Sequence, residues 1–198
     1  MENENLNPDS FFIPARPAVY EEKIKRSVFI AELEICNDEK QARDFLARVI
    51  SKHRDATHNC RAYVINGTEY SSDDGEPSGT AGKPILGAIK KSGLTSVMVI
   101  VTRYFGGVKL GVRGLIDAYG GTAEKVLELA GRVEKIKTRT LEFSFNYNDT
   151  GIISRLLEQN GAENIFYEYG ENVKVKADIP ASLFEDFLEK ISSTTLHS

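Results

Sequence analysis

The sequence predicts an α+β protein made of two domains, and two observations support this fold class. Segments in which apolar and polar residues alternate, as in strands, are interleaved with segments whose apolar residues recur every three or four positions, as on one helix face. The composition also changes at residues 135–137, because 11 of the 16 glycines lie between Gly75 and Gly121 and few follow residue 136. We therefore expect a flexible N-terminal tail over residues 1–15, a first domain over 16–135 and a second over 136–198.

The first domain is expected to alternate strands with three helices. Residues 19–35 alternate well enough to form one or two strands. Asp38 can accept a hydrogen bond from the first turn of a helix over residues 39–52, so it is expected to cap that helix. An Asn-Gly pair at residues 66–67 is typical of the tight turn of a β-hairpin. The elements expected around and after this turn are strands at 60–65 and 69–71, a helix at 81–93, a strand covered on both faces at 94–102 and an amphipathic helix at 113–130.

The second domain has a regular strand, helix, strand, strand, helix order. A strand is expected over residues 141–147, and a helix begins after Asp149. Residues 165–169 and 173–179 are expected to pair as a hairpin, and a last helix follows around residues 183–191. This order suits a small α+β sandwich of about 60 residues.

The composition excludes several classes of protein. The 198 residues are 41% hydrophobic and 27% charged, values that are ordinary for a globular protein and exclude wholesale disorder. The longest apolar run, Val97 to Val101, is far shorter than the ~20 residues of a membrane helix, and the N-terminus lacks the pattern of a secretory signal. Two cysteines cannot form a disulfide framework, which favours the reducing cytoplasm. The net charge of −4 argues against a chain that coats nucleic acid over its whole surface.

Positive charge is concentrated in the middle of the chain, together with glycine. Residues 77–116 contain six lysines and arginines and no acidic residue, whereas both flanking segments carry net negative charge. Glycine lets backbone N–H groups approach a ligand closely, and uncompensated bases attract an anion, so this segment is a candidate anion site. The alternative is that the six bases lie on separate faces and are only solvated.

Two familiar phosphate-binding loops do not match this segment. In the P-loop pattern the second glycine is followed by lysine and then serine or threonine, but Gly111 is followed by Val112 and Arg113. The dinucleotide fingerprint G-x-G-x-x-G fails as well, because Gly106 and Gly107 are adjacent. Neither an ordinary nucleoside triphosphatase nor a Rossmann dehydrogenase is therefore expected.

A glycine-rich turn from a strand into a helix is the strongest candidate for a binding cleft. Such a turn places backbone donors and the positive end of a helix dipole at one point. Arg103 and Lys109 would supply charge there, and Tyr104 or Phe105 a flat surface for a base or sugar. Alternatively, the aromatic residues belong to the core and the glycines only relieve crowding. The residues assigned to this cleft are Arg103, Tyr104, Phe105, Gly106, Gly107, Lys109, Gly111, Arg113 and Lys83.

Acidic and nucleophilic side chains near this turn suggest two further kinds of site. Asp73, Asp74 and Glu76 could bind a divalent cation, but their spacing matches no EF-hand loop, so capping and ion pairing are the expected roles. His58 and Cys60 stand two apart in or beside a strand and therefore share one face. Such a pair can supply an activated nucleophile, although a free cysteine is more often simply buried. These two are the weak candidates for catalysis, and neither a metal nor a cofactor is expected.

Three stretches of the first domain carry a family resemblance: residues 58–60 (HNC), 72–86 (SDDGEPSGTAGKPIL) and 101–111 (VTRYFGGVKLG). They closely resemble the IMPACT family, including its bacterial members of the YigZ and YvyE type, and the two-domain layout extends the resemblance over nearly the whole chain. The resemblance implies a first domain with the fold of the second domain of ribosomal protein S-five. It also implies a ferredoxin-like second domain similar to the last domain of elongation factor G. The sequence departs from the family pattern at Val112, Arg113 and Asp117.

We therefore expect a cytoplasmic, translation-associated regulatory protein that binds RNA or a ribosomal surface through the turn at 103–113 and the loop at 73–84. Eukaryotic members of the family regulate a translation-control kinase with an additional domain, and that partner is not expected for this chain. One alternative is a hydrolase that acts on a phosphorylated or nucleotide substrate in the same cleft. The other is a protein-interaction regulator whose acidic second domain docks a basic partner. No interaction with a membrane is expected.

Overall fold

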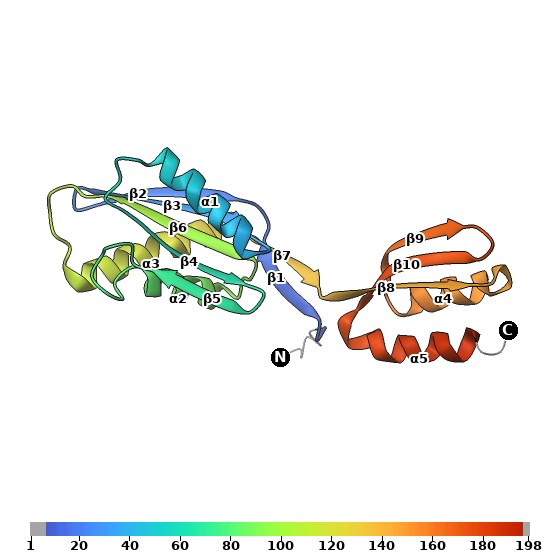
Figure 1. Ribbon diagram of the computed structural model, residues 1–198. Coiled ribbons are helices and arrows are strands. Elements are labelled where there is room, and N and C mark those ends of the chain that lie inside the picture. Colours follow the sequence, from blue (N-terminus) through green and yellow to red (C-terminus); the bar gives the residue numbers. More distant parts are fainter. Residues whose placement is uncertain (1–6, 196–198) are drawn as a thin grey trace, which may run out of the picture. The chain divides into compact units, whose positions relative to one another are not determined.

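The computed structural model describes residues 7–195 and divides them into two compact units. One unit comprises residues 12–134, and the other comprises residues 135–195 together with residues 7–11. Within this described part of the chain, no helix is long and apolar enough to cross a membrane. The elements (Figure 1) are β1 (Ser10–Pro14), β2 (Ala18–Ile24), β3 (Ser27–Ile35), α1 (Glu39–Lys52), β4 (His58–Ile65), β5 (Thr68–Ser72), α2 (Gly82–Ser92), β6 (Val97–Tyr104), α3 (Gly111–Ala130), β7 (Arg132–Ile136), β8 (Thr138–Phe145), η1 (Tyr147–Asp149), α4 (Thr150–Gln159), β9 (Glu163–Tyr169), β10 (Val173–Pro180), η2 (Ala181–Leu183) and α5 (Phe184–Thr195).

A five-stranded antiparallel sheet forms the centre of the larger unit, in the strand order β2-β3-β6-β4-β5. Helix α1 packs on one face of the sheet, and α2 and α3 pack on the other (Figure 1). Strand β6 lies in the middle of these layers, and every residue in it except the last is buried. The expectation that this apolar strand is covered on both faces is therefore confirmed, since a continuous apolar run needs cover on both sides.

Alternation along the strands decides which side chains can meet. The buried valines of β6 pack with α2 and α3, whereas Met98 and Ile100 pack with α1. By the same alternation Arg103 projects toward the α2 and α3 side, and Tyr104 projects toward α1. In the antiparallel pairing of β4 with β6, His58 lies directly opposite Arg103. One end of the sheet therefore brings together two of the candidate residues.

The expected helix over residues 39–52 is confirmed, including its cap. The helix spans Glu39–Lys52, and a carboxylate oxygen of Asp38 accepts a hydrogen bond of 2.7 Å from the N–H of Gln41. The segment 19–35 forms two strands because the chain reverses at residues 25–26, where both residues have left-handed φ angles. A tight reversal of this kind lets β2 pair directly with β3.

The expectation of a loose tail over residues 1–15 is wrong for Ser10–Pro14, which form β1 and pair with β7. The N–H of Thr95 donates a hydrogen bond of 2.9 Å to the carbonyl of Phe12. The guanidinium of Arg132 lies 4.6 Å from the centre of the Phe12 ring. These partners lie far along the chain, so the polar and proline-containing local sequence gave no sign of them. Residues 1–6 of the expected tail lie outside the described residues.

The smaller unit is a three-stranded antiparallel sheet, in the order β8-β10-β9, with α4 and α5 on one face. Alternate residues of β10 from Val173 to Ile179 are buried and pack against apolar residues of both helices. Because β8 and β9 both pair antiparallel with β10, they run parallel to one another with β10 between them. This split βαβ arrangement is the ferredoxin-like one that the family resemblance implied, and the strand and helix order expected from the sequence agrees with it.

Residue Asp9 belongs to the smaller unit and is almost fully buried there. Its carboxylate accepts two hydrogen bonds from Ser182, one from the N–H at 2.9 Å and one from the hydroxyl at 2.6 Å. Its carbonyl accepts a further hydrogen bond from the N–H of Lys137 at 2.8 Å. The hydroxyl and the N–H of Ser182, in that order, lower the pKa of Asp9, and they outweigh the opposing effect of burial.

Asp9→Ala is expected to destabilise the smaller unit at neutral pH and to have little effect in strong acid. The pKa of Asp9 is lower in the folded chain than in the unfolded one. Its stabilising contribution is therefore fully present above about pH 4 and is lost as the pH falls through the folded-state pKa. Thermal unfolding of the variant and of wild type from pH 7 to pH 2, together with hydrogen exchange of the Ser182 amide, measures the stability difference at each pH. Asp44→Ala, at an exposed acid of α1, is the control, and an equal loss of stability at every pH would contradict the assignment.

Candidate functional site

A pocket of about 440 Å³ opens where β4 begins, β6 ends and α3 begins. The buried residues Glu76 and Arg103 form part of its floor. Exposed residues stand at its rim, so the pocket is open to solvent on one side and closed by the protein on the other. The other lining residues are Thr57, His58, Pro77, Phe105, Lys109, Leu110, Gly111, Val112 and Leu115.

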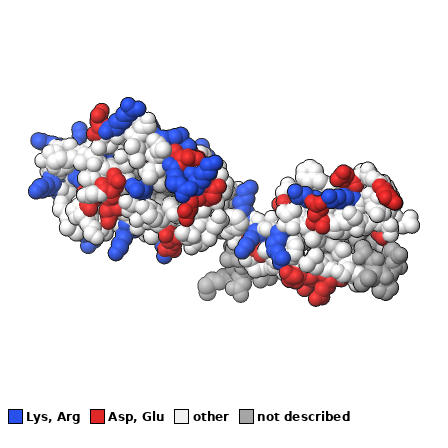
Figure 2. Space-filling model, viewed as in Figure 1, with Lys and Arg blue, Asp and Glu red and all other residues white. Residues whose placement is uncertain are grey.

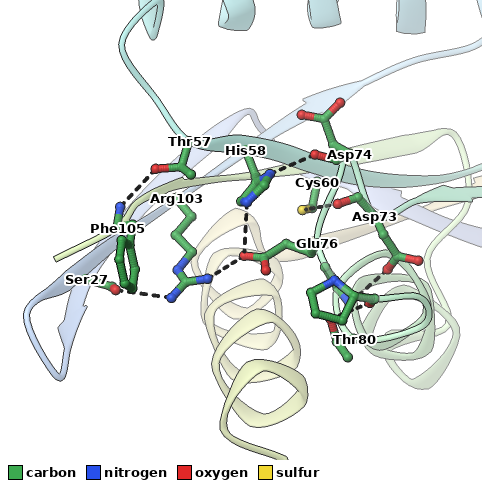
Figure 3. Close-up of polar contacts among 12 residues, drawn as sticks. Ser27, Thr57, His58, Cys60, Asp73, Asp74, Glu76, Thr80, Arg103 and Phe105 are labelled. Atoms are coloured by element: carbon green, nitrogen blue, oxygen red, sulfur yellow. Dashed lines mark hydrogen bonds and ion pairs between the residues drawn. The ribbon is translucent and has the colours of Figure 1, made fainter. Parts of the chain in front are cut away.

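A buried ion pair lies on the floor of the pocket (Figure 3). Nη1 of Arg103 is 2.6 Å from Oε1 of Glu76, and only 6% and 4% of the two side chains is exposed. The hydroxyl of Tyr119 in α3 donates a hydrogen bond of 2.8 Å to the same carboxylate oxygen. The guanidinium also lies 5.5 Å and 5.3 Å from the ring centres of Phe29 and Phe105. These contacts fix the guanidinium and neutralise most of its charge.

One donor of Arg103 is left over. Nε is a buried side-chain nitrogen for which the described residues provide no hydrogen-bond partner. Buried polar groups in folded proteins are nearly always hydrogen-bonded. Nε has almost no accessible surface, so it lies within the floor that Arg103 contributes to the pocket, and a ligand in the pocket reaches it only if the side chain moves.

The imidazole of His58 is oriented by the loop at residues 73–81, called the acidic loop here because it contains Asp73, Asp74 and Glu76. Its Nδ1 is 2.8 Å from the carbonyl oxygen of Asp74, and because a carbonyl can only accept, Nδ1 must carry the proton. The other ring nitrogen, Nε2, points toward Oε1 of Glu76 at 3.9 Å (Figure 3). In the neutral ring this fixes the lone pair on Nε2, on the side of the carboxylate and the pocket.

The loop between β6 and α3 is tied to two neighbouring segments. The N–H of Phe105 donates a hydrogen bond of 3.1 Å to the hydroxyl of Thr57, and the N–H of Gly106 donates one of 3.3 Å to the hydroxyl of Ser27. A Cβ at Gly106 would lie 1.9 Å from the carbonyl oxygen of Arg26. At Gly106 a glycine is therefore needed to relieve crowding, as one of the sequence-based alternatives proposed.

Helix α3 begins at the pocket without a capping side chain. Leu110 occupies the N-cap position and has no polar side chain, and the first turn contains no acidic residue. Gly111 and Val112 line the pocket, so the unpaired N–H groups of the first turn lie beside it. The exposed Lys109 precedes them, and within residues 7–195 it forms no ion pair. A free ammonium and the positive end of a 20-residue helix dipole favour an anion here.

Both units match known protein families. Residues 25–127 match the Impact N-terminal domain, and residues 143–195 match a domain of unknown function, DUF1949. The chain belongs to the IMPACT family. All residues that line the pocket lie within the Impact N-terminal domain. The family resemblance carried by three stretches of the sequence and the expected α+β fold are therefore both confirmed.

The relatives align with nearly the full length of the chain. IMPACT family member YvyE of Bacillus subtilis is 36% identical over 189 residues, which cover 94% of this chain and 87% of YvyE. IMPACT family member YigZ of Escherichia coli is 34% identical over 189 residues, with 93% of each chain covered. A crystal structure of a hypothetical protein superposes with a TM-score of 0.70 at 33% identity, over 96% of this chain and 95% of the other. The sequence alignments with YvyE and YigZ therefore extend over both units, and the solved structure has a similar fold over nearly the whole chain.

The acidic loop of this IMPACT domain stabilises the start of α2. The carboxylate of Asp73 accepts hydrogen bonds of 2.8, 3.0 and 2.8 Å from the N–H groups of Gly79, Ala81 and Gly82. Burial raises the pKa of Asp73, but these three donors outweigh it, and the net pKa is lowered. Asp74 accepts a hydrogen bond from the N–H of Asn59 and forms an ion pair with Arg61, and Glu76 forms an ion pair with Arg103.

Among residues 7–195 no group of three His, Cys, Asp or Glu side chains is placed to hold a metal ion.

The thiol of Cys60 is a poor nucleophile in this environment. The side chain is fully buried, and Sγ donates a hydrogen bond of 3.0 Å to the carbonyl of Asp73. Burial, with smaller contributions from nearby acids, raises the pKa of Cys60 to about 12. The thiolate that a nucleophile requires is therefore disfavoured. His58 and Cys60 lie on the same face of β4, as expected, but only His58 lines the pocket.

The pocket contains some of the nine residues assigned to the cleft and excludes others. Arg103, Phe105, Lys109 and Gly111 line it, and Gly106 and Gly107 form the supporting loop. Tyr104 is placed on the opposite face of the sheet, where its hydroxyl lies 2.8 Å from Nδ1 of His53, because neighbours on a strand point to opposite faces. Lys83 lies in α2 and Arg113 pairs with Asp117 one turn along α3, so neither lines the pocket. Among the other lining residues, Pro77, Leu110 and Val112 belong to the two segments expected to bind but were not assigned individually, and Thr57 and Leu115 lie outside both segments.

Proposed function

We propose that this IMPACT protein is a translation-associated regulatory protein of the cytoplasm that binds RNA, free or within the ribosome. The contact is made by the pocket at the start of α3. The observation that supports this is the convergence of two kinds of unused donor on one pocket: the ammonium of Lys109 and the first-turn N–H groups of α3. Phosphate oxygens are the acceptors that such donors select.

Phe105 supplies a second element that nucleic-acid sites use. Its ring is 46% exposed although it stands beside a buried guanidinium. An exposed ring next to phosphate donors provides a stacking surface for a base or a ribose. On the face that Figure 2 shows, Lys and Arg side chains are intermixed with Asp and Glu side chains, and the chain has a net charge of −4. Binding at one pocket therefore fits this protein better than an extended electrostatic track along a nucleic acid.

Lys109→Ala is expected to weaken RNA binding and to reduce its salt dependence. A lysine that contacts a phosphate releases a counterion, so its removal flattens the slope of log affinity against log salt by roughly one. The free energy of unfolding should change by no more than ~0.5 kcal/mol, because Lys109 is exposed. Fluorescence anisotropy with a labelled single-stranded RNA, from 50 to 300 mM salt, measures both the affinity and the slope.

Lys83→Ala is the matched control, since it removes the same charge from an exposed site that does not line the pocket. We expect this variant to bind RNA with the wild-type slope. If Lys109→Ala and wild type bind RNA with the same affinity and slope, the pocket is not the RNA site. Sedimentation of each variant with ribosomes extends the comparison to ribosomal RNA.

A hydrolase that acts on a phosphorylated substrate in the same pocket is the second candidate. The observation in its favour is the fixed orientation of His58, which holds Nε2 toward Glu76 where it could take a proton from water. Incubation with adenosine monophosphate and 5′-phosphorylated RNA, followed by measurement of inorganic phosphate, distinguishes the two functions. Turnover that disappears in His58→Gln would favour the hydrolase, and binding without turnover would favour the RNA-binding protein.

A further inference from the structure

We propose that the pocket recognises a terminal phosphate, the monoester at the end of an RNA chain or on a single nucleotide, in preference to the internal phosphodiesters of the backbone. This inference rests on the proposed function and specifies the ligand of the same pocket. Three properties of the pocket support it: its closed floor, its balance of charge and its size.

The shape of the pocket favours a chain end. Glu76, Arg103 and Leu115 are each at least 92% buried and close the inner side. Other lining residues, Phe105, Lys109 and Val112 among them, are exposed on the solvent side. An internal phosphodiester is attached on two sides, which suits an open groove. A terminal phosphate has one attachment and three free oxygens, so it can lie against the buried floor while the attached group extends toward solvent.

The charge of the pocket matches a dianion. Arg103 and Glu76 largely neutralise one another. Lys109 contributes one full charge, and the uncapped N-terminus of α3 contributes about half a charge. The sum of about +1.5 corresponds to the −1.5 to −2 that a phosphate monoester carries at pH 7, whereas a diester carries only −1.

The size of the pocket suits one nucleotide unit. Its volume of about 440 Å³ lies within the ~300–1,000 Å³ that is typical of small-molecule sites. With a phosphate at the start of α3, the ring of Phe105 at the rim is placed to contact the attached sugar or base. The recognised unit is therefore a nucleoside monophosphate, either alone or at the end of single-stranded RNA.

The test compares ligands that differ only in the terminal phosphate, on the wild-type full chain. Isothermal titration calorimetry or NMR titration is performed with adenosine against adenosine monophosphate. It is repeated with one ten-nucleotide RNA that carries a 5′-hydroxyl, a 5′-phosphate or a 3′-phosphate. We expect at least a tenfold higher affinity for a terminally phosphorylated form. Equal affinity of all forms would overturn the inference, while binding that still depends on Lys109 would leave the proposed function standing.

A variant at Val112 separates binding from folding. Val112 is 61% exposed in the first turn of α3 and lines the pocket. In Val112→Glu the carboxylate stands where an acidic residue favours the helix dipole, so the melting temperature should equal or exceed that of wild type. The same carboxylate repels a phosphate, so affinity for adenosine monophosphate should fall at least tenfold.

Leu129→Glu is the control, because it adds the same charge to an exposed site of α3, 17 residues or about 25 Å further along the helix. We expect this variant to bind adenosine monophosphate like wild type. A folded Val112→Glu variant that retains wild-type affinity would overturn the assignment of the phosphate to the start of α3. Loss of terminal-phosphate binding in Val112→Glu together with retained binding in Leu129→Glu supports it.

Discussion

Glu76→Ala is expected to lower the free energy of unfolding by about 3–5 kcal/mol, the usual effect of removing one partner of a buried ion pair. Arg103 would remain charged and 95% buried, near two aromatic rings, with the hydroxyl of Tyr119 also deprived of its acceptor. Equilibrium unfolding in urea, followed by circular dichroism, measures this loss.

Two comparisons identify the cause of that loss. Glu69→Ala removes an acid that pairs with Lys90 at 2.9 Å on the surface, and it should change the free energy of unfolding by less than ~1 kcal/mol. The double variant Glu76→Leu/Arg103→Met replaces both charges with apolar side chains and should recover most of the stability, because no unpaired charge remains. If Glu76→Ala were no more destabilising than Glu69→Ala, Arg103 would not depend on this carboxylate.

Local sequence signals predicted much of the fold because those signals act over a few residues. The Asp38 cap, the Asn-Gly turn at residues 66–67 and the apolar run of β6 each determine structure within about ten residues of themselves. All three elements are confirmed. The tail was misjudged because β1 is held by β7 and by Thr95 and Arg132, and no short-range pattern in the sequence reveals such distant partners.

The candidate site was predictable only in part, for a similar reason. The glycine-rich turn after β6 pointed to residues 103–113, and Arg103, Phe105 and Lys109 from this segment do line one pocket. Strict alternation could also have separated Tyr104 from its two neighbours, since consecutive residues of a strand face opposite sides. The pairing of Arg103 with Glu76 depends on the register between β4 and β6 and on the path of the acidic loop. Neither can be read from one sequence.

Gly106→Ala is expected to destabilise the larger unit by about 3–5 kcal/mol, far more than the same change at the adjacent glycine. A Cβ at residue 106 would lie 1.9 Å from the carbonyl oxygen of Arg26 and 2.2 Å from its carbonyl carbon. Both atoms belong to the backbone of the turn between β2 and β3, so no side-chain rotation can relieve the clash. The loop must move, and its hydrogen bonds to Thr57 and Ser27 are then lost.

Gly107→Ala is the matched control, because a Cβ at Gly107 meets nothing within 4 Å and only the φ angle of +82° opposes the substitution. That conformation costs an alanine about 1–2 kcal/mol. In urea unfolding, Gly106→Ala should therefore be clearly less stable than Gly107→Ala. At temperatures where both variants remain folded, phosphate binding should be retained in Gly107→Ala and lost in Gly106→Ala. Equal stabilities would mean that the loop yields easily at Arg26. In that case the close contact of Gly106 with the β2–β3 turn would not be what holds Phe105 and Lys109 at the pocket.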